Sequence, residues 1–408
     1  MVHCLYIDVD NFKLVNDIYG HAKGDALLVF ISELLNEAFC GQLVVRMGGD
    51  EFVVFCDGRM ARADMEERLF ALQERLRRGD FDDNVEKLLS FSIGVSYSQP
   101  VRAGLHVILE QADVAMYQVK KSGKGHFVVY EDIRVQIEEE KLIKERAFQG
   151  EIWQELRLLY RPVVYIQTSD IYAVETVLQW DFPGKGVLSE EKFMPVLEQY
   201  GMDIRLGLNV LENVCAQKQR WRDTEFDQIE FYVRLTSRFL LQKDCIDVIA
   251  GCMEKYHVGY HEIQLCIGEN DFSEKGEKLY AAAQKLLDMG FKVAIDNLAS
   301  SSLYVLQRLP SQLLKLDANL LAKTQYNKKS VYILRNVISL GRDLECGIVA
   351  QGIGNTAQVK MLASYGAQFG VGDFYGMPCD ENTFFDSYRD RLFHTHNLRP
   401  TRFSFTQQ

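Results

Sequence analysis

The chain lacks the features that would place it in a membrane, outside the cell or along a nucleic acid. Its nine cysteines are scattered singly, without a C-x-x-C pair, which favours free thiols in a reducing compartment. No apolar run approaches the ~18 residues that a membrane span needs, and no signal peptide precedes the first predicted strand. A net charge of −11 argues against non-specific nucleic-acid binding, although it leaves room for a nucleotide pocket. We therefore expect a cytoplasmic protein.

The composition that remains is that of a globular protein. Apolar residues make up 47% of the 408 residues and charged residues 25%, which is not a disordered composition. This length suggests about two domains, at ~100–200 residues each. No short internal repeat or low-complexity segment is present.

The first 132 residues alternate predicted strands and helices, with one hairpin among them. The hairpin joins "LVVRM" to "FVVFC" through Gly48-Gly49-Asp50-Glu51. The pattern predicts a mixed sheet with helices packed on it. Taken alone, the turn is typical of a surface hairpin, but its glycines would also allow a ligand to approach the backbone closely.

Carboxylates also end the first predicted strand, "CLYIDVD", at Asp8 and Asp10. If this strand lies beside the hairpin, Asp8 and Asp50 converge. Two carboxylates and a backbone carbonyl are suitable Mg²⁺ ligands when phosphate oxygens complete the shell.

Other polar residues in this part could contact a nucleotide. Asn16 and Asp25, expected in a loop and at a helix start, offer an amide and a carboxylate to a guanine edge. They are equally explained as a turn amide and a helix N-cap. Lys120 and Lys124 lie four apart at a predicted helix end, hence on one face. They could meet phosphates or form a solvated helix terminus.

These residues together resemble the GGDEF diguanylate cyclase family, through "DVDNFKLVNDIYGHAKGD", "RMGGDEF", "FSIGVS" and "ADVAMYQVKKSGKG". The resemblance implies synthesis of cyclic di-GMP from two GTP by two such units meeting face to face. The family's usual helix before the first strand is not part of this chain. The implied roles are metal binding by Asp8, Asp50 and the Val9 carbonyl, guanine recognition by Asn16 and Asp25, space for GTP over Gly48 and Gly49, assistance at the metal and the attacking 3′-hydroxyl by Glu51, and phosphate binding by Lys120 and Lys124.

A charged helical stretch, residues 133–150, is expected to link this domain to a second one at 151–395, followed by a tail at 396–408. The second part contains eight strand-like runs, and amphipathic helices separate most of them. This alternation predicts a (β/α)8 barrel, whose chemistry lies at the carboxyl ends of the strands.

The barrel resembles the EAL phosphodiesterase family, through "LLYRPVV", "VETVLQW", "SLYVLQRLP", "LLKLD" and "GVGDFYGMP". Four expected site residues are kept: Glu175, Glu269, Asp296 and Lys315. The positions that depart from the family pattern are Arg161, Gln179, Arg234, Cys266, Asn297, Gln351, Gly354 and Val371.

The remaining carboxylates are too few to offset the dehydration of two Mg²⁺ ions. We expect no metal in the barrel and no hydrolysis of cyclic di-GMP. Arg234, where the family has an Asn ligand, is expected to replace the metal's charge by pairing with Glu175 or Asp296. Cys266 is expected to fill the core.

Two functions stay open at this point. One is a cyclase module, with Mg²⁺ and GTP, joined to a silent barrel that regulates or docks. The other is a non-enzymatic scaffold in which both domains bind partners or nucleotides. Phosphodiesterase activity ranks last. The expected partners are GTP, with cyclic di-GMP open as a second ligand, and another copy or another protein at the barrel; no nucleic acid is expected.

Overall fold

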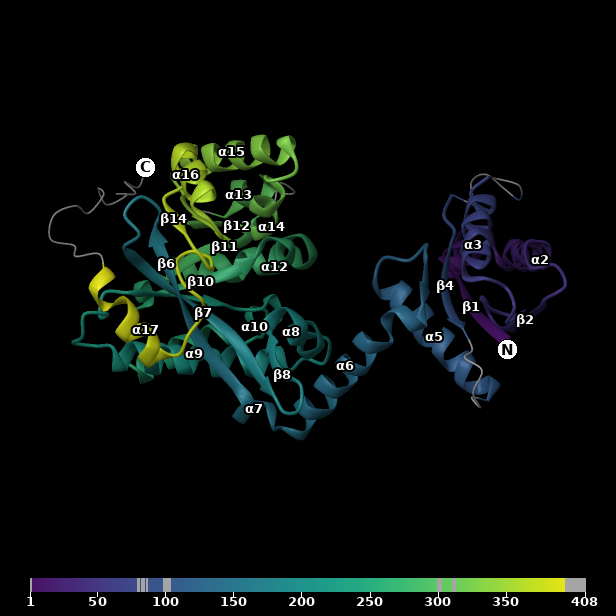
Figure 1. Ribbon diagram of the computed structural model, residues 1–408, viewed down its shortest axis with the longest axis horizontal. Coiled ribbons are helices and arrows are strands. Elements are labelled where there is room, and N and C mark those ends of the chain that lie inside the picture. Colours follow the sequence, from purple (N-terminus) through teal and green to yellow (C-terminus); the bar gives the residue numbers. More distant parts are fainter. Residues whose placement is uncertain are drawn as a thin grey trace. The chain divides into compact units, whose positions relative to one another are not determined.

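The computed structural model describes residues 2–78, 81, 85, 87–97, 104–298, 303–309 and 313–392. The expected tail at 396–408 lies outside these residues. The chain divides after Leu142 into two compact units, which are described separately below (Figure 1). Among the described residues, no helix combines the length and the apolar character needed to cross a bilayer.

The first unit is built on a five-stranded sheet in the order β2-β3-β1-β4-β5. All neighbouring strands are antiparallel except β4 and β5, which run parallel, so the predicted mixed sheet is confirmed. The strands are β1 (Val2–Asp10), β2 (Leu43–Gly48), β3 (Glu51–Asp57), β4 (Ser90–Tyr97) and β5 (Phe127–Val129). The helices are α1 (Phe12–Tyr19), α2 (His21–Ala38), α3 (Arg62–Leu76), α5 (Leu105–Lys121) and α6 (Tyr130–Gln149), of which α6 continues into the second unit.

The alternation of side chains along β1 assigns one face to the core and the other to polar chemistry. Leu5, Ile7 and Val9 pack into the main core together with side chains of α1, α2 and α3. Cys4, on the opposite face, packs against Ile108 and Ala112 of α5. Because the side-chain period is two, Tyr6, Asp8 and Asp10 share this face with Cys4. The sheet therefore points the predicted metal-binding carboxylate toward α5.

The second unit is a closed barrel. Its sheet follows the order β6-β14-β13-β12-β11-β10-β9-β7, and a further pairing between β6 and β7 closes the ring. The barrel strands are β6 (Leu156–Tyr165), β7 (Ile171–Phe182), β9 (Glu230–Arg234), β10 (Ile263–Gly268), β11 (Lys292–Leu298), β12 (Leu313–Leu316), β13 (Gly347–Ala350) and β14 (Phe369–Gly370). All eight predicted runs are strands of this barrel.

One departure from a regular (β/α)8 barrel is the direction of β6, which runs antiparallel to both β7 and β14. A short turn connects β6 directly to β7, whereas a parallel neighbour would need a crossover helix. Outside the ring, β8 (Gly186–Ser189) pairs with β7. The surrounding helices are α7 (Ile152–Glu155), α8 (Glu190–Gln199), α9 (Asp203–Arg220), α10 (Ser237–Leu240), α11 (Cys245–Lys255), α12 (Glu269–Asp288), α13 (Leu303–Arg308), α14 (Ala318–Lys323), α15 (Lys328–Asp343), α16 (Thr356–Tyr365) and α17 (Glu381–Tyr388).

A layer of buried side chains fills the barrel, so its interior is a core and not a channel. Seven of the strands and the residue directly after β14 supply one member each. The members of this interior layer are Val163, Ala173, Tyr232, Cys266, Ala294, Leu313, Val349 and Val371. Cys266 therefore lies in the packed interior, where it is 1% exposed.

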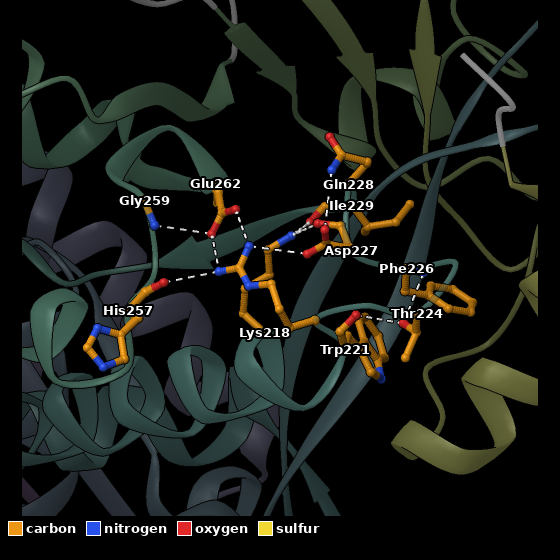
Figure 2. Close-up of polar contacts among 11 residues, drawn as sticks. Lys218, Trp221, Thr224, Phe226, Asp227, Gln228, Ile229, His257, Gly259 and Glu262 are labelled. Atoms are coloured by element: carbon orange, nitrogen blue, oxygen red, sulfur yellow. Dashed lines mark hydrogen bonds and ion pairs between the residues drawn. The ribbon is translucent and has the colours of Figure 1, made fainter. Parts of the chain in front are cut away.

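The connection between α9 and β9 is organised around a buried lysine (Figure 2). The ammonium group of Lys218 donates hydrogen bonds to the backbone carbonyls of Asp227 and Ile229. Arg222 donates to Asp227, to Glu262 and to the carbonyl of His257. These contacts fix the entry to β9 at the end of the strand opposite Arg234, so they support the barrel from outside the candidate site.

Candidate functional sites

The hairpin turn of the first unit presents an open backbone surface. Gly49 has a φ of 53°, which is in the left-handed region that favours glycine, and Arg46 holds the turn by donating two hydrogen bonds to the Gly49 carbonyl. A Cβ atom built on either Gly48 or Gly49 would meet nothing within 4 Å. The predicted turn thus exists, and a ligand could lie directly on its backbone.

Asp8 lies near the end of β1, and Asp50 lies in the turn directly before the neighbouring β3. Asp8 pairs in register with Glu51, and the Val9 N–H donates to the Asp50 carbonyl at 3.1 Å. Burial raises the pKa of the Asp8 carboxyl; Lys120 opposes this, whereas the charges of Asp50 and Asp10 raise it further, and the net pKa lies above the ordinary value. The two predicted metal-binding carboxylates are therefore near enough for the charge of Asp50 to raise the pKa of Asp8.

Lys120 reaches this carboxylate directly. Its ammonium nitrogen lies 2.5 Å from Asp8 Oδ2, whereas Lys124 donates to Asn11 Oδ1 at 3.3 Å. The prediction that the two lysines share a helix face is wrong, because α5 ends at Lys121 and the chain turns through positive φ at Gly123 and Lys124. Both cations nevertheless contact the end of β1.

Asn16 and Asp25 lie on helices and not at the predicted loop and helix start. Gly20, with a φ of 85°, separates α1 from α2, so Asn16 is inside α1 and Asp25 is in the second turn of α2. A Cβ atom on Gly24 would lie 1.9 Å from Asn16 Oδ1. Gly24 thus makes room for the Asn16 amide beside the exposed Asp25.

Two neighbours of this site had no assigned role in the sequence prediction. Asp10 accepts hydrogen bonds from Ser90 Oγ, Ser92 Oγ and the Gly125 N–H, at 2.6, 2.8 and 3.2 Å, which fastens the loop after α5 to β1. The Tyr6 hydroxyl donates to Glu51 Oε2 at 2.9 Å. The alternation of side chains along β1 could have identified both residues, because it places Tyr6 and Asp10 on the same face of the strand as Asp8.

These residues fit a magnesium ion that shares its shell with a nucleotide. Within the described part of the chain, no three or more His, Cys, Asp or Glu side chains form a ready-made metal cage. Mg²⁺ in nucleotide sites commonly takes only one or two carboxylates, with phosphate oxygens and water completing its shell. Asp8, Asp50 and the Val9 carbonyl match that donor chemistry.

The barrel site forms the next layer above the interior layer. Two residues further along the chain on β7, β9, β11 and β12, and directly after the end of β13, the side chains are Glu175, Arg234, Asp296, Lys315 and Gln351. Because β6 runs in the opposite direction, its equivalent residue lies two positions earlier, at Arg161. The period of two thus brings the predicted residues of these strands to one end of the barrel.

Two buried carboxylates at this end are bound by protein cations and amides. Glu175 accepts from Lys315 at 2.6 Å and from both Nε and NH2 of Arg161, at 3.0 and 2.5 Å. Asp296 Oδ1 lies 3.2 Å from Lys315 Nζ and accepts at 2.7 Å from Gln351 and at 2.9 Å from the Asn297 N–H. Although burial acts to raise the pKa of Glu175, Lys315 and Arg161 lower it to about 2.

Arg234 points to the same cavity but does not take the predicted role. The ion pairs of Glu175 and Asp296 in the described residues are made by Arg161 and Lys315. Arg234 lines the cavity; partial desolvation acts to lower its pKa, but the nearby charges of Asp296 and Glu190 outweigh this and raise it. The predicted ion pair is thus replaced by one from Arg161, which lies opposite Glu175 in the β6–β7 register.

A cavity of about 570 Å³ opens over this layer. Its remaining acidic residues come from the start of α8, the end of α8 and the start of α9, and they are Glu190, Glu191, Glu198 and Asp203. Burial raises the pKa of Glu190, although Arg234 opposes this. More carboxylates than cations line the cavity, so a ligand with several negative charges would be repelled.

The other predicted barrel residues lie around this centre. Glu269 is buried at the start of α12, directly after β10. Asn297 is exposed with a φ of 54°. Gln179 donates to Asp181 at 3.3 Å on β7. Val371 is buried in the interior layer, where it has no donor to offer a ligand.

The barrel end does not fit a divalent metal as it is arranged. Both oxygens of Glu175 and one of Asp296 already accept hydrogen bonds from N–H groups, and the Lys315 ammonium lies between the two carboxylates. A metal ion would have to displace these donors while gaining few anionic ligands.

Two family models match the chain in tandem. The model described as "Diguanylate cyclase, GGDEF domain" matches residues 1–126, and the EAL domain model matches residues 145–378. A curated relative, the bifunctional diguanylate cyclase/cyclic di-GMP phosphodiesterase MucR of Pseudomonas aeruginosa, is 27% identical over 378 residues, which are 92% of this chain and 55% of that protein. The chain thus spans little more than half of this relative.

Solved structures share the fold. The S helix-GGDEF-EAL structure of Vibrio cholerae LapD, bound to c-di-GMP, has a TM-score of 0.59 at 14% identity and covers 92% of this chain and 89% of its own. The FimX EAL domain from Pseudomonas aeruginosa, also bound to c-di-GMP, has a TM-score of 0.52 at 17% identity and covers 59% of this chain and 96% of its own. At these identities, the likeness concerns the fold alone.

Proposed function

Since the chain belongs to the EAL domain family and carries a GGDEF domain ahead of the barrel, we propose that it acts in cyclic di-GMP signalling. In this proposal, the first unit binds GTP with Mg²⁺ and condenses two GTP to cyclic di-GMP. The barrel is catalytically silent and regulates the first unit or docks a partner.

A single arrangement carries the cyclase proposal: Asp8 and Glu51 are paired on neighbouring strands, with Asp50 at the open turn between the strands of the hairpin. Bound by Asp8, Asp50 and the Val9 carbonyl, Mg²⁺ would offset the negative charge of the triphosphate. Gly48 and Gly49 leave room for the nucleotide, and Lys120 and Lys124 supply ammonium groups for its phosphates. Asn16 and Asp25 are proposed to bind the guanine edge.

The reaction then depends mainly on positioning. The 3′-oxygen of one GTP attacks the α-phosphorus of another, its proton leaves, and pyrophosphate departs as the P–O bond to the β-phosphate breaks. Glu51, which accepts a hydrogen bond from the Tyr6 hydroxyl, is proposed to accept this proton or to orient the attacking group. Two units must face each other, because each contributes one GTP and two such bonds are formed.

The proposal of a silent barrel is supported by the contacts of its carboxylates. A phosphodiesterase of this fold would need Glu175 and Asp296 as anionic metal ligands. Arg161 forms an ion pair with Glu175, and Gln351 donates a hydrogen bond to Asp296, and both of these residues depart from the family pattern. The excess of carboxylates around the cavity also disfavours a ligand with two negative phosphodiester groups.

The same barrel contacts favour a second candidate, a wholly non-enzymatic scaffold. If one domain has lost its catalytic ligands, the other could be kept for binding GTP or a partner without turnover. The two candidates differ in one observable, the formation of cyclic di-GMP.

The deciding experiment incubates the purified full chain with GTP and Mg²⁺ at high protein concentration, where two units can meet. Chromatography should show cyclic di-GMP and pyrophosphate, and Asp50→Ala should remove both products. If wild type binds GTP without forming product, the scaffold is the better description. A parallel incubation with cyclic di-GMP and Mg²⁺ should leave the dinucleotide intact; its hydrolysis would contradict the silent barrel.

A further inference from the structure

The contact between Lys120 and Asp8 conflicts with the separate roles proposed for these two residues. Asp8 is proposed to bind the metal and Lys120 a phosphate, yet the ammonium nitrogen lies 2.5 Å from Asp8 Oδ2. A carboxylate oxygen in direct contact with an ammonium group cannot bind a metal equally well, because both cations compete for the same lone pairs.

The surroundings of Asp8 make a cation necessary there. Asp8 is 6% exposed, and the nearby carboxylates of Asp50 and Asp10 oppose its ionisation. The hydrogen bonds of Asp10 come from two serine hydroxyls and a backbone N–H, which are neutral donors and bring no positive charge to this place. Among the described residues, Lys120 is the cation within ion-pair distance of Asp8. Without it, a buried carboxylate would stand beside other negative charges.

The side chain of Lys120 can also move away from Asp8. Lys120 occupies the last turn of α5, and its side chain is 32% exposed, whereas that of Asp8 is 8% exposed. A lysine side chain is flexible, and its ammonium group is readily hydrated. It can therefore leave Asp8 without disturbing the buried strand.

We propose that Lys120 is the counter-ion of Asp8 in the nucleotide-free protein and is exchanged for the metal when Mg²⁺ and GTP bind together. This inference rests on the proposed GTP-binding function. Metal alone must displace Lys120 and leave its ammonium group in water. When GTP is present, the released ammonium group gains a phosphate. Metal and nucleotide therefore favour each other's binding, and a divalent ion without nucleotide binds the site only weakly.

If Lys120 only bound the nucleotide, its removal would leave the Mn²⁺ affinity of the nucleotide-free chain unchanged; the exchange predicts that this affinity rises. In Lys120→Met, the competing cation is gone, so Mn²⁺ should bind the nucleotide-free chain more tightly than wild type, by roughly fivefold or more for a coupling of this kind. The same variant should bind GTP with Mn²⁺ less tightly, because a phosphate contact is lost. The free Mn²⁺ signal in electron paramagnetic resonance measures the first quantity, and calorimetry measures the second.

Lys124→Met is the matched control. It removes the same charge four residues further along the chain, but Lys124 contacts the neutral amide of Asn11 and not a carboxylate. Mn²⁺ affinity without nucleotide should therefore stay at the wild-type value, while GTP binding weakens. Asp8→Asn should abolish the Mn²⁺ site and defines the background from other acidic groups.

Two results would overturn the proposed exchange of Lys120 for the metal. Equal gains in Mn²⁺ affinity from both lysine variants would reduce the effect to general electrostatics and overturn it. Unchanged, weaker or absent Mn²⁺ binding in Lys120→Met would also overturn it. Failure of wild type to bind GTP with a metal argues instead against the proposed function, whereas GTP binding with no Mn²⁺ gain in Lys120→Met argues against the exchange alone.

Discussion

Lys315 and Glu175 form an ion pair across the barrel. Lys315 Nζ donates to Glu175 Oε1 at 2.6 Å from β12, and it also lies 3.2 Å from Asp296 Oδ1 on the neighbouring β11. All three side chains are buried. A protein cation thus lies between two carboxylates at the strand ends, and it joins β7 to the opposite side of the ring.

Removal of this cation should destabilise the barrel strongly. Lys315→Met leaves Glu175 with only Arg161 and Asp296 with only hydrogen-bond donors, and breaking a buried pair from one side typically costs about 3–5 kcal/mol. Urea unfolding followed by tryptophan fluorescence measures this, because Trp153, Trp180 and Trp221 all belong to the barrel unit. The exposed Lys323→Met should stay within about 0.5 kcal/mol of wild type. Equal stability of both variants would show that the pair contributes nothing.

The Glu175 carboxylate should also make barrel stability depend on pH. Lys315 and Arg161 outweigh burial and lower its pKa from 4.5 to about 2, so the folded state binds its proton less readily than the unfolded state. Its contribution is therefore complete above pH 4.5 and is lost as pH falls toward about 2, with a slope of up to about 1.4 kcal/mol per pH unit.

Glu175→Gln tests this pH dependence. The stability difference between wild type and Glu175→Gln should be largest near pH 6 and should shrink as the solution is acidified. Glu225→Gln, at an exposed position, should show a difference that is small at every pH. A wild-type advantage over Glu175→Gln that grows at low pH would contradict the lowered pKa of Glu175.

The sequence was sufficient to predict the barrel because each strand has its own short apolar run. The period of two then places Glu175, Asp296 and Lys315 at one end without knowledge of any contact. What the sequence could not supply was the competition among three cations for two carboxylates. Arg161 contacts Glu175 because the antiparallel pairing of β6 with β7 places the two residues directly opposite each other. This register follows from the direction of β6.

In the first unit, the predicted residues were found near the expected sheet edge, but the local backbone differed. Gly20 divides the segment after β1 into two helices, whereas the pattern favoured a loop before one helix. The end of α5 at Lys121 similarly separated two lysines that a continuous helix would have aligned. Positive φ values accompany both helix ends, at Gly20 in the first case and at Gly123 and Lys124 in the second.

Gly24 should be required for guanine binding more than for folding. A methyl group at this position would push the Asn16 amide aside, because the built Cβ lies 1.9 Å from Asn16 Oδ1. Alanine is otherwise a good helix former. Gly24→Ala should therefore lower GTP affinity roughly tenfold, as expected for loss of a hydrogen bond to the base, while thermal stability changes little.

A double-mutant cycle checks that Gly24 acts through Asn16. Asn16→Ala alone should weaken GTP binding by a similar factor, measured by calorimetry with Mg²⁺. The double variant should be no weaker than either single one, since both remove the same contact. Additive losses would mean that Gly24 affects the nucleotide by another route, and unchanged GTP affinity in both single variants would exclude Asn16 as a guanine ligand.

Lys218 should stabilise the barrel without any part in ligand binding. It is 1% exposed, and its ammonium group satisfies the carbonyls of Asp227 and Ile229 where the chain enters β9 (Figure 2). Lys218→Met keeps most of the side-chain volume but leaves the buried Ile229 carbonyl and the half-buried Asp227 carbonyl without this donor, at about 1–3 kcal/mol for a buried acceptor. The midpoint of urea unfolding, read by tryptophan fluorescence, should fall accordingly, whereas Gln228→Ala on the exposed side of the same loop should leave it nearly unchanged. Because Lys218 belongs to the barrel unit and the proposed GTP-binding residues belong to the first unit, GTP binding and any cyclic di-GMP formed should match wild type at temperatures where the variant is folded. A loss of product at such temperatures, with the barrel still folded, would instead reveal that the entry to β9 is coupled to the first unit.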